Sequence, residues 1–228
     1  MNRTADGLIV GAGVIGSATA FELAKRGYKT LNIDKLPASG YGSTSNSCAI
    51  VRAHYSTWDG VAMAYEGFFY WDDWNKYLEV EDERGMAKYM KTGSIMFMLK
   101  GADHSKKSLN LFKEIGVEHE IWDLETLKKK MPIYSHDSYN GTSRPDEDDS
   151  FFDKSGDQIE GAVWTPGSGY VSDPQLATHN LQVATEAKGG EFLFDAEITE
   201  IRQSNGQIQG VTLKSGEQID CKVLVNVA

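Results

Sequence analysis

The first 35 residues alternate between apolar and polar blocks that predict three elements. An apolar run at 8–10 is followed directly by glycines at positions 11, 13 and 16. From 14 to 26 the small and apolar side chains share one helical face, and Gly27 stands where a helix ends. Residues 29–34 then alternate as a second strand. Strand, helix and strand form a βαβ unit, so we expect a core of parallel sheet.

The rest of the chain shows helical and extended patterns in a mixed order. These patterns predict helices over 61–77, 105–115, 124–131 and 174–188, and strands over 91–99, 191–194, 196–203, 207–214 and 221–227. Aromatic residues gather around the first of these helices, at spacings typical of a buried face. We expect most of them to pack in the core rather than form a cage around a substrate; they are Trp58, Tyr65, Phe68, Phe69, Tyr70, Trp71 and Trp74.

Segment 134–160 differs from its surroundings because it is polar and contains the acidic run 146–149. We interpret it as a solvated loop. A calcium site is the alternative, but the order of acidic residues around a central glycine that an EF-hand requires is absent.

The glycines at 11, 13 and 16 fit the G-x-G-x-x-G pattern of dinucleotide-binding proteins. Gly11 permits a tight turn, Gly13 lets a pyrophosphate approach the backbone, and Gly16 lets the helix pack closely on the strand. The helix start then offers free N–H groups to the anion. Asp34 follows 18 residues after Gly16, at the end of the second strand, where a carboxylate can bind ribose hydroxyls. Both FAD and NAD are compatible with this pattern.

Composition narrows the class of protein. Of the 228 residues, 40% are hydrophobic and 11% aromatic, which is enough for a packed core. The net charge of −10 argues against a nucleic-acid partner, because such partners recruit clustered Lys and Arg. We find no secretory signal, no apolar run near the roughly 20 residues of a membrane span, and only two cysteines. We therefore predict a cytoplasmic protein without a metal site.

Beyond the glycine turn, run 42–52 (GSTSNSCAIVR) resembles the FAD-dependent D-amino acid oxidase-like oxidoreductases, which include sarcosine oxidase, dimethylglycine dehydrogenase and glycine oxidase. In that family a segment of small residues at this place wraps the pyrophosphate and the flavin side of the cofactor. Segments 167–174, 195–201 and 222–228 resemble, in turn, the return to the FAD domain, the strand beside the adenine and the strand that leads to an Ala-Gly pair.

The resemblance implies an α/β fold: a Rossmann-like FAD-binding domain of the glutathione reductase type, interrupted by an α+β substrate domain. We assign residues 1–60 and 171–228 to the FAD-binding domain and residues 61–170, with an acidic insertion near 134–160, to the substrate domain. Members of the family continue beyond the last strand seen here. We therefore expect an N-terminal part of a longer protein that is inactive alone; the alternative is a short protein, or a subunit completed by a partner.

The motifs and the resemblance together predict FAD as the cofactor. The residues expected to bind it are Gly11, Gly13, Val14, Ile15, Gly16, Asp34, Lys35, Gly42, Ser43, Thr44, Ser45, Asn46, Ser47, Ile198 and Ala228. Asn46 stands where dimethylglycine dehydrogenase-like members carry the histidine that attaches the flavin, so we do not expect a histidyl-flavin. Ala49 stands where sarcosine oxidase-like members have a second basic residue, which weakens a close match to sarcosine oxidase.

The resemblance also implies a reaction, in which a hydride leaves the carbon beside an amine and FAD accepts it. The substrate would be a small amine or amino acid, and the final acceptor oxygen or an electron-transfer protein. Arg52 is our candidate for binding a substrate carboxylate, with a structural ion pair as the alternative. Tyr55 is a second candidate, whereas we expect His54 to be exposed or to pack. A flavin dehydrogenase of hydroxy acids or glycerol phosphate, and a nucleotide-binding piece without turnover, are the alternative functions.

Overall fold

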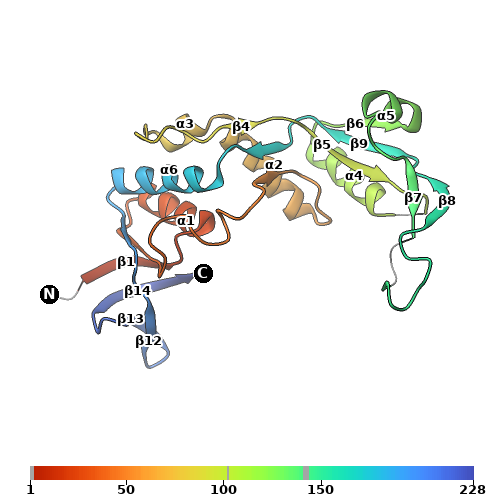
Figure 1. Cartoon of the computed structure of the whole chain (residues 1–228). Coiled ribbons are helices and arrows are strands. Elements are labelled where there is room, and N and C mark those ends of the chain that lie inside the picture. Colours follow the sequence, from red (N-terminus) through yellow and green to blue (C-terminus); the bar gives the residue numbers. More distant parts are fainter. Residues whose placement is uncertain (1–2, 102, 141–143) are drawn as a thin grey trace. The chain divides into compact units, whose positions relative to one another are not determined.

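A computed structural model describes residues 3–101, 103–140 and 144–228, and its contacts divide the chain into two compact units (Figure 1). Unit 1 consists of Met1–Ile50, Tyr70–Tyr89 and Val171–Ala228, and unit 2 of Val51–Phe69 and Met90–Tyr170. Residues 70–89, which the sequence analysis assigned to the interrupting domain, thus group with unit 1. The chain passes between the units within β3 (Ile50–Val51), α2 (Trp58–Asp72), β4 (Tyr89–Met90) and β10 (Gly169–Val171).

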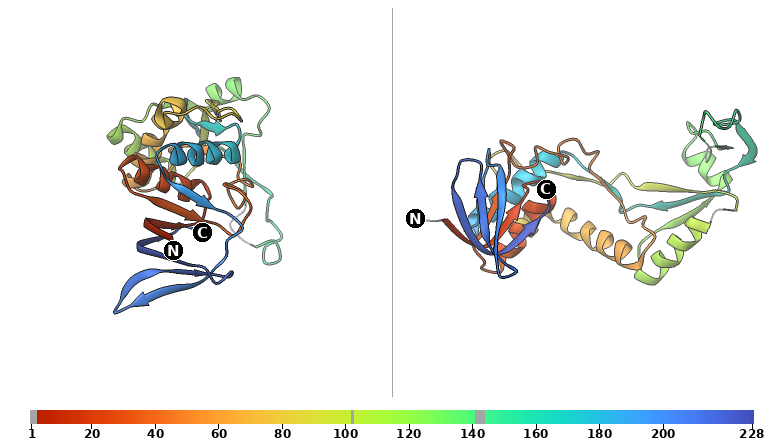
Figure 2. Two further views of the ribbon diagram at one scale, coloured as in Figure 1. Left: turned by 90° about the vertical axis from the view of Figure 1, so that its left-hand side faces the viewer. Right: turned by 90° about the horizontal axis from the view of Figure 1, so that it is seen from below.

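Unit 1 is built on a six-stranded sheet with the strand order β11-β2-β1-β14-β13-β12. The first four strands of this order are parallel, and β14, β13 and β12 form an antiparallel meander, drawn in blue (Figure 2). Its elements are β1 (Arg3–Val10), α1 (Val14–Lys25), β2 (Thr30–Ile33), α3 (Trp74–Leu78), α6 (Pro174–Ala187), β11 (Glu191–Leu193), β12 (Ile198–Ser204), β13 (Gln207–Leu213) and β14 (Gln218–Asn226). The predicted βαβ unit is present as β1, α1 and β2.

Both faces of β1 are covered, which explains why its apolar residues are consecutive rather than alternating. Leu8 packs in a cluster with Val211 and Ile219 of the meander. A Cβ at Gly7 would lie 3.6 Å from Leu23 of α1, so Gly7 and Ile9, two residues apart, face the helix side. Leu8 and Ile9 are therefore both fully buried.

Helices α1 and α6 pack side by side over the sheet (Figure 1). The buried face of α1 is made of small residues and one large one, Phe21, whereas the buried face of α6 mixes apolar and polar residues. Phe21 makes an edge-on contact with the ring of Tyr77 in α3, at a centroid distance of 5.2 Å. This contact joins the excursion 70–89 to the helical layer.

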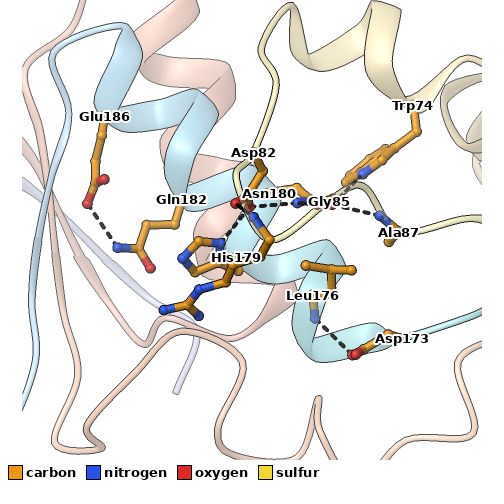
Figure 3. Close-up of polar contacts among 11 residues, drawn as sticks. Trp74, Asp82, Gly85, Ala87, Asp173, Leu176, His179, Asn180, Gln182 and Glu186 are labelled. Carbon is orange, nitrogen blue, oxygen red and sulfur yellow. Dashed lines mark hydrogen bonds and ion pairs between the residues drawn. The ribbon is translucent and has the colours of Figure 1, made fainter.

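A buried polar cluster fixes the same excursion to α6 (Figure 3). Asn180 uses its full hydrogen-bonding capacity: its amide donates to Asp82 at 2.8 Å and to the Gly85 carbonyl at 2.9 Å. Its Oδ1 accepts from the Ala87 N–H at 3.0 Å and from the Trp74 indole at 3.3 Å. One side chain on α6 thus forms hydrogen bonds with four groups of segment 70–89.

Asp82 is the charged member of this cluster. Burial alone raises the pKa of its carboxyl, but hydrogen bonds from the Arg84 N–H, His179 and Asn180 outweigh burial, so the pKa is lowered from its ordinary value. The carboxylate is therefore the stable form at neutral pH.

Unit 2 contains a three-stranded antiparallel sheet of order β5-β9-β6. The short antiparallel pair β7-β8 lies between β6 and β9 in the sequence. Its elements are β5 (Ser94–Met98), α4 (Asp103–Ile115), β6 (Glu120–Asp123), α5 (Leu124–Lys130), β7 (Asp137–Tyr139), β8 (Lys154–Gln158) and β9 (Gly161–Thr165). Phe112 of α4 packs with Val61, Phe68 and Val163 in one apolar cluster. A second cluster contains Trp122, Leu127, Ile159 and Ala162.

The expectation that segment 134–160 is a loop is wrong in part. Segment 134–160 is not entirely loop, because β7 and β8 pair as an antiparallel hairpin. Every residue of β8 is exposed, so the strand carries no apolar alternation that the sequence could reveal. Residues 141–143 of the same segment lie outside the described residues.

The aromatic residues around α2 do not form a mostly buried face. Phe68 and Trp74 are buried, but Trp58, Phe69 and Tyr70 are each more than two-fifths exposed. Tyr65 contacts Phe68 and Phe69, and Trp71 stacks on Trp74, so the rings pack largely on one another. Spacing predicted the helix, but it did not predict which of these rings are buried.

The polar cluster leads to a prediction about stability. We expect Asn180→Leu to lower the free energy of unfolding by about 3 kcal/mol, because the Ala87 N–H and the Trp74 indole lose their acceptor. Gln182→Leu, on the same helix, removes only an exposed bond to Glu186 and should change stability by less than about 0.5 kcal/mol. Urea denaturation followed by circular dichroism measures both. Equal losses in the two variants would contradict the role of Asn180.

Candidate functional site: a dinucleotide cradle

The glycine turn joins β1 to α1 under tight steric constraints. Gly11 has φ +107°, and a Cβ there would lie 3.0 Å from the carbonyl oxygen of Val227. A Cβ at Gly16 would lie only 2.0 Å from the Gly11 carbonyl oxygen. Any side chain at position 16 therefore pushes α1 away from β1. Position 13 differs, because a Cβ there would meet only Thr44 Oγ1, at 3.2 Å.

The start of α1 is open toward a ligand. Gly13 is its N-cap and has no side chain to accept the first N–H groups. The Val14 N–H donates to Thr44 Oγ1 at 3.1 Å, and Ile15 is exposed. Free N–H groups and the helix dipole favour an anion at this point.

Asp34 organises the turn as well as facing the site. Its Oδ2 accepts from the Ala12 N–H at 2.7 Å, and its Oδ1 accepts from the Leu36 N–H at 2.9 Å. A carboxylate has about four acceptor positions, so both oxygens retain lone pairs for hydroxyl groups. The carboxylate thus holds the cradle together before it binds anything.

A pocket of about 250 Å³ opens beside Asp34. It is lined by Val10, Gly11, Ile33, Asp34, Lys35, Ala196, Glu197, Ile198 and Ala228. Four predicted residues besides Asp34 are thereby brought together at one edge of the sheet: Gly11, Lys35, Ile198 and Ala228. Sequence reasoning missed Val10, Ile33, Ala196 and Glu197, which only the meeting of β1, β2 and β12 brings to this pocket.

Only part of run 42–47 contacts the glycine turn, whereas all six residues were predicted to bind the cofactor. Thr44 is buried and reaches α1, whereas Ser43, Ser45, Asn46 and Ser47 are exposed. The side chains of Ser45 and Asn46 donate to the Gly42 carbonyl, each at 3.0 Å. Ser47 Oγ accepts from the Ala49 N–H at 3.0 Å. These three side chains stabilise their own loop, and Thr44 links it to the glycine turn.

The sequence analysis also missed one polar residue that contacts the glycine turn. Asn32 lies fully buried in the middle of β2, and its amide donates to the Gly11 carbonyl at 3.3 Å. An asparagine inside an otherwise apolar strand is the signal that could have revealed it, because buried amides need partners.

Arg52 and Tyr55 lie in unit 2. Arg52 is an exposed residue, and its guanidinium donates to the His54 carbonyl at 2.6 Å and lies 5.3 Å from the centroid of the Tyr55 ring. Within residues 3–101, 103–140 and 144–228, no acidic side chain forms an ion pair with Arg52. The structure thus offers no support for the alternative of a structural ion pair.

A glycine turn, an acid directly after β2 and the pocket beside it define unit 1 as a dinucleotide-binding module of the Rossmann type. The family model described as FAD dependent oxidoreductase (DAO) matches residues 6–228, and the chain therefore belongs to this family of FAD-dependent oxidoreductases. The predicted family, the oxidoreductase class and FAD as the cofactor are confirmed. The cradle fits that cofactor, because the start of α1 has no side-chain cap and the Asp34 carboxylate retains acceptor positions for hydroxyl groups.

Named relatives agree with this membership. The chain is similar to a D-amino acid dehydrogenase of Rhodopseudomonas palustris (25% identity over 92% of this chain and 56% of the relative). It is also similar to a putative sarcosine oxidase of Caenorhabditis elegans (30% identity over 64% of this chain and 36% of the relative). The chain thus spans about half the length, or less, of these relatives.

Solved structures confirm the predicted fold class. The L-proline dehydrogenase of P. horikoshii matches with a TM-score of 0.78 at 21% identity, covering 100% of this chain and 54% of that one. The glycine oxidase of Geobacillus kaustophilus matches with a TM-score of 0.73 at 20% identity, covering 100% of this chain and 56% of that one. Among the described residues, no helix has the length and apolar character that a membrane crossing requires.

The second and third glycines of the turn, Gly13 and Gly16, lead to opposite predictions. Gly16→Ala should unfold cofactor-free protein at a lower temperature, because its Cβ collides with the Gly11 carbonyl. Gly13→Ala should leave that temperature nearly unchanged but weaken FAD binding about ten- to hundredfold, the equivalent of a steric cost of about 1–3 kcal/mol. Thermal unfolding and FAD titration measure the two effects.

Gly67→Ala is the matched control, because a Cβ at Gly67 meets nothing within 4 Å. Tight FAD binding by the Gly13→Ala protein would overturn the assignment of the pyrophosphate site.

Asp34 should contribute to both stability and binding. We expect Asp34→Ala to lower the stability of the cofactor-free protein by about 1–3 kcal/mol, since the Ala12 and Leu36 N–H groups lose their acceptor, and to weaken FAD binding as well. Glu217→Ala, also in unit 1, is the control, because Glu217 is exposed and does not line the pocket. Chemical denaturation without FAD and titration with FAD separate the two roles. An unchanged affinity in Asp34→Ala would show that the carboxylate does not face the cofactor.

Proposed function

We propose that the protein oxidises the C–N bond of a small amine or amino acid, of the sarcosine, dimethylglycine, glycine or D-amino acid type. Membership of the FAD-dependent oxidoreductase family supports the redox class, and relatives named as D-amino acid dehydrogenase and sarcosine oxidase support the substrate class. The observation that carries the proposal is the exposed Arg52 guanidinium, which has no acidic partner within the described part of the chain.

The residues of unit 1 would hold the cofactor by its nucleotide end. The start of α1 and Thr44 would bind the pyrophosphate, Asp34 the ribose hydroxyls, and the pocket beside Ile198 the adenine. When bound, FAD supplies the acceptor for a hydride from the carbon beside the amine. The remaining predicted residues of the cradle, including Lys35 and the loop 42–47, belong to the same proposal.

Arg52 would orient the substrate. One Nη is bonded to the His54 carbonyl, and the fork of five donors that arginine carries leaves others for a carboxylate. The Tyr55 ring beside it is partly exposed and would form one wall of the substrate site. In this proposal unit 2 is the first part of the substrate domain.

A second function has one specific observation in its favour. The chain is similar to a glycerol 3-phosphate dehydrogenase of Caloramator mitchellensis, at 24% identity over 98% of this chain and 41% of the relative. Arginine binds phosphate as well as carboxylate, so Arg52 alone does not separate a flavin dehydrogenase of glycerol phosphate or a hydroxy acid from an amine oxidoreductase.

The electron acceptor and the compartment complete the proposal. Oxygen or an electron-transfer protein would reoxidise the cofactor. A cytoplasmic location is supported by the two free cysteines, Cys48 and Cys221, because disulfides are rare in reducing compartments.

Anaerobic bleaching of the flavin absorbance tests the substrate class. With the full-length protein reconstituted with FAD, we expect sarcosine, glycine or D-alanine to bleach the visible band, and glycerol 3-phosphate and lactate to leave it unchanged. Arg52→Met should raise the substrate concentration for half-bleaching about ten- to hundredfold, as expected for a lost charge-assisted bond. Arg144→Met, also in unit 2, is the matched control.

Bleaching by glycerol 3-phosphate alone would establish the second function. An intact flavin band with every substrate would identify a nucleotide-binding protein without turnover.

A further inference from the structure

The turn that follows Arg52 is held by a buried histidine. Ala53 is fully buried, and the Tyr55 N–H donates to the Ala53 carbonyl at 2.9 Å, which closes a tight turn around His54. His54 itself is only 8% exposed. An exposed position, one of the two expectations for this residue, is therefore excluded, and packing is observed.

Two neighbours fix the imidazole ring from different sides. His54 Nε2 and Thr165 Oγ1 are hydrogen-bonded at 2.8 Å, and Thr165, at the end of β9, is 1% exposed. The ring also stacks on Phe112 of α4, with centroids 5.4 Å apart and planes inclined by 28°. Phe112 belongs to the main apolar cluster of unit 2 and is fully buried. Rotation of the imidazole thus requires that one of these contacts break.

The backbone of the same residue holds the guanidinium. The His54 carbonyl accepts from Arg52 Nη1 at 2.6 Å, and the Tyr55 ring lies against the guanidinium. The direction of that carbonyl depends on the turn, and the turn is anchored through the His54 ring. An arginine side chain loses rotamer entropy when it is fixed, so a rigid acceptor removes part of this loss before a ligand arrives.

We propose that His54 is a positioning residue for Arg52: its ring, held by Thr165 and Phe112, orients the carbonyl that keeps the guanidinium in place for a carboxylate. The positioning rests on the geometry of unit 2, and only its use for a substrate carboxylate rests on the proposed function. No contact between His54 and the substrate is required.

Order at the Arg52 side chain is the direct test. In protein labelled with ¹⁵N-arginine, the Arg52 Nε–H signal is assigned by its loss in Arg52→Lys, and its heteronuclear NOE reports order. Thr165→Val keeps the side-chain shape but removes the hydroxyl, so we expect the NOE of Arg52 to fall. Thr165→Ser should restore it. Ser168→Ala is the control, since Ser168 is buried and its hydroxyl has no hydrogen-bond partner among the described residues.

Carboxylate binding is measured on the same samples. Trimethylglycine is the probe, because it carries a carboxylate but cannot form an imine, and choline is its analogue without the carboxylate. We expect trimethylglycine to shift the Arg52 signal, choline to leave it unchanged, and Thr165→Val to weaken trimethylglycine binding about tenfold, the scale of one lost hydrogen bond.

The two readouts separate the possible failures. An Arg52 NOE that stays at the wild-type value in both Thr165→Val and His54→Gln would overturn the positioning role. Absence of trimethylglycine binding in the wild type, together with a lowered NOE in Thr165→Val, would overturn the proposed use of Arg52 and leave the positioning intact. If Thr165→Val does not fold, the His54→Gln protein and the Thr165→Ser rescue decide.

Discussion

The space between the Gly11 carbonyl and the start of α1 is the constraint on which the rest of unit 1 depends. A Cβ at position 16 would lie 2.0 Å from that oxygen, so strand and helix can approach only where position 16 has no side chain. The turn is enclosed on its other side by Val227 at the end of β14, 3.0 Å from a Cβ at Gly11. The first strand, the first helix and the last strand thus meet in one crowded corner. The uncapped start of α1, which is the proposed site of the pyrophosphate, adjoins this corner.

Polar contacts between distant segments then tie the surrounding loops to this corner. Asp34 accepts from Ala12, 22 residues earlier, and Thr44 accepts from Val14, 30 residues earlier. Both bonds form within the protein itself, so the loops have their conformation before a ligand binds. Such preorganisation lowers the entropy lost on binding. Asp34 and Thr44 make these connections to the turn. The side chains of Ser45 and Asn46, in contrast, donate to the Gly42 carbonyl of their own loop.

Local patterns predicted the structure well where the physical cause is local. The glycine spacing, the helical run after it and the short second strand each depend on neighbours within a few residues, and the βαβ unit followed from them. The alternation expected in the second strand is absent, because all four residues of β2 are buried. The Asn180 cluster escaped prediction because its partner Asp82 lies 98 residues away. The burial of the aromatic rings around α2 depends in the same way on tertiary partners. The β7-β8 hairpin was missed for a different reason, since an exposed strand need not alternate between apolar and polar residues.

The order of the chain itself connects the cofactor cradle with the candidate substrate residue. Ser47, the last predicted residue of the cradle loop, is followed five positions later by Arg52. An extended chain spans at most about 3.6 Å per residue, so the two Cα atoms are within about 18 Å of each other in any arrangement of the two units. In the proposed function, this covalent connection would limit the distance between a substrate bound by Arg52 and a cofactor bound by unit 1. Within that radius a flexible arginine could adopt many positions. The proposed anchoring of the Arg52 guanidinium by the His54 carbonyl would add a limit on its direction to the limit that the chain places on its distance.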